Sequence, residues 1–102
     1  MANALTRGLR PIHPGELLRE DVLPALARSK VEIAALLGIS RQHLYDLLQE
    51  RKAVTPAMAL RIAKLTGTTP ESWMDMQRNY DLARARARLG KALDTIPTLG
   101  AA

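Results

Sequence analysis

The stretch from Ser29 to Leu48 constrains the fold of this chain more than any other part of the sequence. Ser29 and Ser40 each stand ahead of a short run in which apolar residues recur at helical spacing. Serine favours helix starts because its hydroxyl oxygen accepts a hydrogen bond from a free backbone N–H, and Glu32 completes a capping-box pattern with Ser29. Gly38 lies between the two runs and can adopt the positive φ that ends a helix sharply. We therefore expect two short helices joined by a tight turn.

The apolar residues of these two helices predict which sides face the core. The first side should be formed by Val31, Ile33, Ala34, Leu36 and Leu37, and the second by Leu44, Leu47 and Leu48. Ala34 is small where the helices must approach closely, and Ile39 should insert the turn into the core. Two helices joined in this way form a helix-turn-helix, in which the start of the second helix lies in the major groove of DNA.

The side of the second helix that faces away from the core carries side chains able to read base pairs. Arg41 can donate two hydrogen bonds to guanine, and Gln42 can bind adenine through both amide groups. Tyr45 could contact a thymine methyl, and Asp46 a cytosine amine. The alternative is an ordinary solvated helix face. The predicted base contacts are Ser40, Arg41, Gln42, His43, Tyr45 and Asp46.

A second group of residues is placed to contact the DNA backbone. Free amides at a helix start favour an anion, and cations that follow the second helix can neutralise phosphates. For any one of these residues, simple surface charge is an alternative interpretation. The predicted phosphate contacts are Ser29, Lys30, Gln49, Arg51 and Lys52.

Three more helices are expected around this pair. The first begins near Pro14, and Pro24 should kink or end it, because proline lacks the N–H that a helix interior requires. Thr55 and Thr69, each followed by proline, begin a helix that ends at Gly67 and another that runs toward Leu89. No segment has the pattern of a strand. We predict one all-α, five-helix domain over residues 13–89, between a flexible arm (1–12) and a flexible tail (90–102).

Composition narrows the range of functions. The formal net charge is +5 and the sequence has no cysteine, which favours an anionic partner such as double-stranded DNA and excludes disulfides and thiolate metal sites. The two histidines lack nearby ligands for a metal, and no catalytic arrangement is evident from the spacing of residues. We expect no enzyme activity, no cofactor and no metal. The chain shows no signal peptide or membrane-spanning segment, so we expect a cytoplasmic protein.

Four motifs outside the central pair resemble those of HigA-type antitoxins, which belong to the phage-repressor-like (Xre-type) helix-turn-helix proteins. These motifs span His13 to Leu23, Thr55 to Gly67, Thr69 to Gln77 and Asn79 to Leu82, so the resemblance covers about residues 12–83. It implies a homodimer that binds a palindromic operator, represses its own operon and neutralises a toxin similar to the RelE/HigB-type mRNA endonucleases. Two residues depart from the family pattern, with Ala27 where glycine is frequent and Arg28 where an apolar residue is usual. A stand-alone regulator without a toxin is the alternative.

The C-terminal helix is expected to form the dimer. Its large side chains at helical spacing suit either a core or a dimer interface, and the resemblance places Trp73 in the core and Tyr80 and Leu82 nearer the contact. An alanine-interleaved basic run follows from Arg84 to Lys91, which could be a solvated extension, a second phosphate contact or a toxin-binding arm. The predicted dimer interface is Trp73, Met76, Tyr80 and Leu82.

Overall fold

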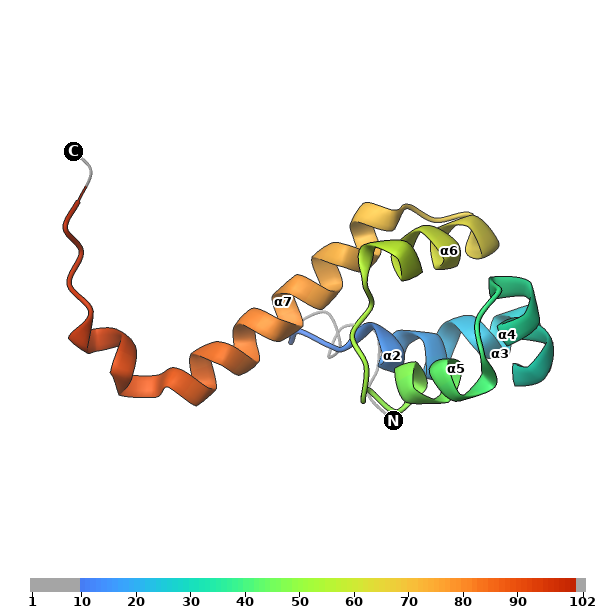
Figure 1. The fold of residues 1–102 in the computed structure, drawn as a ribbon, viewed down its shortest axis with the longest axis horizontal. Helices are drawn as coiled ribbons and strands as arrows, with labels where there is room; N and C mark the ends of the chain where they lie inside the picture. The colour runs from blue at the N-terminus through green and yellow to red at the C-terminus, as the bar shows by residue number, and fades with distance from the viewer. Residues whose placement is uncertain (1–9, 101–102) are drawn as a thin grey trace.

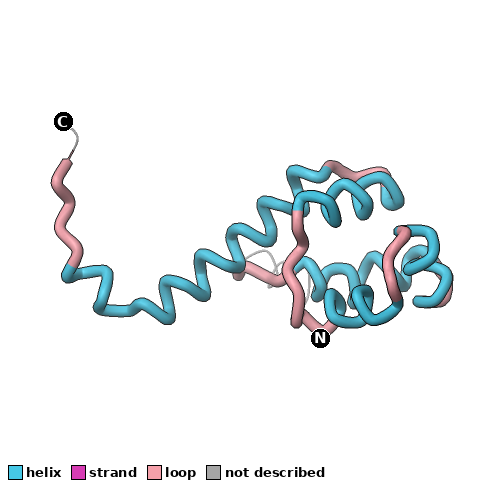
Figure 2. Tube along the Cα trace, viewed as in Figure 1, coloured by secondary structure: helices cyan, strands magenta, loops and turns pink. Residues whose placement is uncertain are grey.

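The computed structural model describes residues 10–100 of the 102-residue chain, and in that range it contains helices and no strand (Figures 1 and 2). Five helical stretches follow one another along the chain. The first comprises α2 (Pro14–Leu17), η1 (Leu18–Val22) and α3 (Leu23–Leu26), and the others are α4 (Lys30–Leu37), α5 (Arg41–Leu48), α6 (Pro56–Thr66) and α7 (Pro70–Leu89), which leads into a 3-10 turn, η2 (Gly90–Thr95). The predicted all-α, five-helix fold is confirmed.

Each of the five stretches begins with a side chain that caps it. The capping atom accepts a hydrogen bond from a backbone N–H in the first turn, which would otherwise lack a partner. The distances lie between 2.9 and 3.2 Å. Glu32 does not complete the capping box, because its carboxylate binds Arg28 at 2.7 Å instead. The five caps are His13, Ser29, Ser40, Thr55 and Thr69.

The first stretch does not end at Pro24. It continues to Leu26 and contains a wider, π-helical turn just before the proline, in which the N–H of Leu23 bonds to the carbonyl of Leu18. A regular α-helix would bring the proline ring against the carbonyl four residues earlier, and a π-helical turn at this point relieves such a conflict. Ala27 then ends the stretch in the left-handed conformation, with a φ of 54°. This conformation explains why glycine suits that position.

The core lies between the first stretch and helices α4, α5 and α6, and the start of α7 closes it. Gly15 brings α2 against α5 so closely that a Cβ at this position would overlap the carbonyl oxygen of Leu47. Two residues expected in the core are outside it, because Val31 is 52% and Leu36 is 55% exposed. That part of the prediction is wrong. Trp73 is 3% exposed, and the largest side chains that are fully buried are Ile33, Leu44, Leu47, Leu48, Met58, Ile62, Val54 and Pro14.

Helix α7 belongs to the core for only about half of its length. Its first half packs against α6 and α2, and buried Gln77 accepts a hydrogen bond from the N–H of Val54 at 2.8 Å. Its second half extends away from the other helices, as Figure 1 shows. The predicted tail begins with η2, whose residues are all exposed. The domain limits remain predictions, and most of the predicted arm (1–9) and residues 101–102 lie outside the described residues.

Between residues 10 and 100, every helix is too short or too polar to cross a bilayer.

Candidate nucleic-acid interface

A glycine turn sets the angle between α4 and α5. Gly38 has a φ of 73°, and a Cβ at this residue would lie 2.7 Å from the Arg61 guanidinium. That guanidinium donates a hydrogen bond to the carbonyl of Leu37 at 2.8 Å, which closes the end of α4. Ile39 is half-buried against the core, as expected. The turn therefore holds the two helices in a defined arrangement rather than connecting them loosely.

Helix α5 presents opposite chemistry on its two sides. Leu44, Leu47 and Leu48 are each no more than 1% exposed and attach the helix to the core. Arg41 and Gln42 are exposed in the first turn, and the Arg41 side chain has no hydrogen bond or ion pair with another described residue. Because the opposite side of α5 is packed in the core, the helix is held in place and these two side chains project into solvent.

The other predicted base contacts lie around this first turn. Ser40 caps α5, with its Oγ 3.0 Å from the N–H of His43, and His43 itself is half-buried. The Tyr45 ring is 38% exposed, and the Lys30 ammonium lies 5.8 Å from its centre. The structure thus brings a residue from the start of α4 next to one on α5.

The Asp46 carboxylate contacts two side chains, one earlier and one later in the chain. Its Oδ1 accepts a hydrogen bond from Gln42 Nε2 at 2.9 Å and lies 3.3 Å from Arg51 Nε. Its side chain is only 17% exposed, whereas that of Arg51 is 63% exposed. One carboxylate therefore links a predicted base contact to a predicted phosphate contact.

The predicted phosphate contacts form two groups on the surface. Ser29 and Lys30 are exposed at the start of α4, and Gln49, Arg51 and Lys52 are exposed just after α5. Cations at the start of one helix and the end of the next could contact a DNA strand on both sides of α5. Their contact with DNA remains a prediction.

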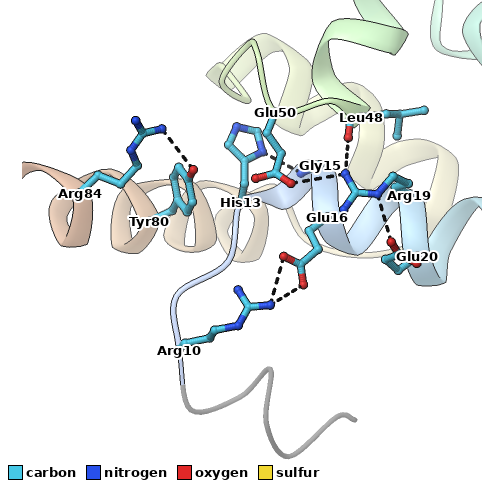
Figure 3. A network of polar contacts seen from close by, with 10 residues as sticks. All are labelled: Arg10, His13, Gly15, Glu16, Arg19, Glu20, Leu48, Glu50, Tyr80 and Arg84. Atoms are coloured by element: carbon cyan, nitrogen blue, oxygen red, sulfur yellow. Dashed lines mark hydrogen bonds and ion pairs between the residues drawn. The ribbon is translucent and has the colours of Figure 1, made fainter. Parts of the chain in front are cut away.

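The turn after α5 is held by a residue that sequence reasoning missed. Arg19, on η1, donates a hydrogen bond to the carbonyl of Leu48 at 2.7 Å and pairs with Glu50 at 3.3 Å (Figure 3). Glu50 has a φ of 63°, which is unfavourable for a residue with a side chain. The ion pair therefore stabilises a strained turn that carries Arg51 and Lys52.

His13 lies between α5 and α7 rather than in a metal site. It is 3% exposed, its Nδ1 caps α2, and its ring meets that of Tyr80 edge-on at 5.0 Å (Figure 3). Burial lowers the pKa of His13 below its ordinary value, although the charges of Glu50 and Asp81 act in the opposite direction. The neutral ring suits its role as a cap. Among the residues that the structure describes, no three His, Asp or Glu side chains gather where they could hold a metal ion.

The predicted dimer residues separate into two kinds. Trp73 is 3% exposed and its Nε1 donates to Thr68 Oγ1 at 2.7 Å, so it belongs to the core and offers almost no surface to a second copy. We therefore remove Trp73 from the candidate interface. Tyr80 is half-buried by His13, and Arg84 donates a hydrogen bond to its hydroxyl at 3.2 Å. Met76 and Leu82 line an open groove of about 670 Å³ between α7 and residues 10–12.

Comparison with known proteins identifies this arrangement. The family model described as "Helix-turn-helix" matches residues 18–73. The fold is similar to that of the Pseudomonas aeruginosa antitoxin HigA, solved with the higBA promoter, at a TM-score of 0.82 and 35% identity over 89% of this chain and 100% of that one. It is equally similar to the antitoxin GraA in complex with its operator, at a TM-score of 0.82 and 36% identity over 90% and 94% of the two chains.

A curated relative supports the same family. An uncharacterised HTH-type transcriptional regulator of Haemophilus influenzae is 32% identical over 73 residues, which cover 72% of this chain and 68% of the relative. These relatives are regulators and antitoxins rather than enzymes. The chain belongs to the helix-turn-helix family, and its structural neighbours within that family include HigA antitoxins.

Proposed function

We propose that this protein is an antitoxin and transcriptional repressor that binds a palindromic operator as a homodimer. The observation that carries the proposal is the two-sided character of α5, where a leucine side buried in the core supports an exposed polar side. Arg41 and Gln42 stand at the N-terminal turn of this helix, which is the part that enters the major groove in a helix-turn-helix. A repressor acts where the chromosome is, so we place the protein in the cytoplasm.

The roles of individual residues follow from their chemistry. Ser40, Arg41, Gln42 and His43 would read bases, with Tyr45 one turn further along the helix. The cations Lys30, Arg51 and Lys52, together with Ser29 and Gln49, would bind phosphates on either side of α5. Phosphate contacts supply affinity for any sequence, whereas base contacts supply preference for one.

The proposed dimer uses the groove along α7. Met76 and Leu82 line this groove, and Leu82 is 43% exposed in the single chain. A second copy at this position would cover apolar surface and present a second α5 to the same DNA. Operator half-sites should then be centred about 34 Å apart, one turn of the double helix.

The toxin partner is the second part of the proposal. The likeness to HigA antitoxins over most of the chain supports a partner similar to the RelE/HigB-type mRNA endonucleases. Coexpression with the product of the neighbouring gene, followed by copurification and a growth assay, tests this part. Failure of the two proteins to copurify would contradict it while leaving DNA binding intact.

The DNA-binding part is tested by two substitutions with different expected patterns. Arg41→Ala should cost about 1–3 kcal/mol of binding free energy and relax preference at one base pair. Lys52→Ala should weaken binding to all sequences alike and lower the salt dependence. Titration by gel shift against the operator and against a scrambled duplex separates the two patterns. Unchanged operator affinity of Arg41→Ala would refute the base-reading role.

A stand-alone regulator is the second candidate function, and the Haemophilus relative, described only as a transcriptional regulator, favours it. It requires the same DNA contacts but no toxin. Operator binding without any effect of the neighbouring gene product on growth would support this alternative.

A further inference from the structure

We propose that Asp46 is a positioning residue that determines how Gln42 reads DNA, and that it does not itself contact a base. The inference rests on the proposed function, since it concerns how the DNA-binding surface selects a sequence. Asp46 and Gln42 are four residues apart on α5 and therefore lie on the same side of the helix. Among the described residues, theirs is the only hydrogen bond that joins the side chains of two predicted base-reading residues.

The chemistry of the pair fixes the orientation of the Gln42 amide. An ionised carboxylate can only accept hydrogen bonds, so the amide must turn its nitrogen toward Asp46 Oδ1. The second N–H and the carbonyl oxygen of the amide remain available to DNA. One donor beside one acceptor matches adenine, which offers N7 as an acceptor and its amine as a donor. A freely rotating amide could instead direct both of its N–H groups at guanine, which offers two acceptors.

The environment of Asp46 argues against direct base contact. Its Oδ1 already faces both Gln42 Nε2 and Arg51 Nε, and only 17% of its side chain is exposed. A bare carboxylate near a phosphate backbone would be repelled, and the Arg51 guanidinium offsets that charge. The Asp46 side chain is thus less accessible to DNA than those of Gln42 and Arg51.

Asp46 also holds the residues that follow α5. Its carbonyl oxygen accepts hydrogen bonds from the N–H of Arg51 at 2.8 Å and of Lys52 at 3.3 Å. Through its side chain and its backbone, one residue therefore connects a base-reading amide to two cations proposed to bind phosphate. This connection fixes the position of the Gln42 amide relative to Arg51 and Lys52.

The test compares base preferences selected from a randomised operator library. Gln42→Ala first identifies the base pair that depends on Gln42. Asp46→Asn keeps the size of the side chain but removes the pure acceptor, so it should reduce the preference for adenine at that same base pair by about tenfold. Adding Asp46→Asn to Gln42→Ala should change the preference at this pair no further, and Asp46→Ala should repeat the result of Asp46→Asn.

Controls separate positioning from charge and from misfolding. Glu71→Gln raises the net charge by the same amount at the start of α7, so it should increase affinity for all sequences slightly without changing preference. Circular dichroism checks that each variant is folded. A change of preference at a different base pair would show that Asp46 reads a base itself and would overturn the inference, as would an unchanged preference at the Gln42 pair. A wild-type protein that selects no sequence would refute the proposed function, and the inference would fall with it.

Discussion

Replacing Gly15 by alanine tests the close approach between α2 and α5. The new Cβ would lie 3.1 Å from the carbonyl carbon of Leu47 and would overlap its oxygen, whereas carbon atoms attract one another best at about 3.5–4.0 Å. The Leu47 oxygen already accepts a hydrogen bond from the N–H of Glu50 at 3.0 Å, so it cannot simply turn aside. The two helices would have to move apart.

The expected cost follows from this overlap. Forcing an extra carbon into a well-packed contact costs about 1–3 kcal/mol, and alanine returns at most about 1 kcal/mol through its greater helix propensity. We expect a net loss of about 2 kcal/mol in the free energy of unfolding, which lowers Tm by about 8–16 °C in a domain of this size. Displacement of α5 should also weaken operator binding.

Thermal denaturation followed by circular dichroism measures the first effect, and a gel-shift titration at a temperature where the variant is folded measures the second. Gly67→Ala is the matched control, because Gly67 has a φ of 68° but open space around its Cβ position. It should cost about 1–2 kcal/mol through backbone strain alone and leave operator affinity unchanged. A Gly15→Ala protein as stable as the parent would refute the proposed close contact.

Three other substitutions test separate features. Ala27→Gly should raise stability by about 0.5–1 kcal/mol in a thermal melt, because Ala27 occupies the left-handed conformation and glycine adopts it without strain; a fall in Tm would contradict this account. Gln77→Leu should lower the free energy of unfolding in urea by about 1–3 kcal/mol, since it leaves the buried N–H of Val54 without its acceptor, and a neutral result would show that this bond is dispensable. Burial lowers the pKa of His13 below 6.5, so the unfolded chain binds more protons than the folded one near that pH. The neutral ring therefore contributes its full stability above pH 6.5, and this contribution should be lost as the pH falls through the pKa of the folded protein. His13→Asn keeps a capping oxygen but should abolish this part of the pH dependence, and equal slopes for the two proteins between about pH 7.5 and 5.5 would contradict the assignment.

The parts of the fold that local chemistry determines were predicted from the sequence. Ser29, Ser40, Thr55 and Thr69 each begin a helix because their side chains bond to an N–H only three residues away. Gly38 ends α4 for an equally local reason. These signals require no knowledge of the rest of the chain.

The errors arise where a distant neighbour decides the outcome. Val31 and Leu36 were wrongly expected in the core because α4 has only eight residues, and two turns are too few for apolar spacing to define one side of a helix. Trp73 has the helical spacing of Met76 and Tyr80, so spacing alone could not separate it from the dimer residues, whereas its burial and its hydrogen bond to Thr68 assign it to the core.

Much of the candidate site depends on contacts of the same long-range kind. Arg19 reaches the carbonyl of a residue 29 positions later, and no local pattern indicates that contact. The left-handed conformation of Glu50 is equally hidden, because glycine or asparagine would be the usual residue there. The exposed polar side of α5 was predictable, whereas the bonds that orient it were not.

The second half of α7 extends beyond the other helices, so changes to its exposed residues should cost the single chain little stability. Residues on α5 have less freedom, because that helix also supplies three leucines to the core. With the proposed dimer along α7, related proteins in one cell would differ in which copies pair through substitutions confined to the extended second half of this helix. Each such protein would then pair with its own copies and not with those of its relatives, while the core residues stayed the same in all of them.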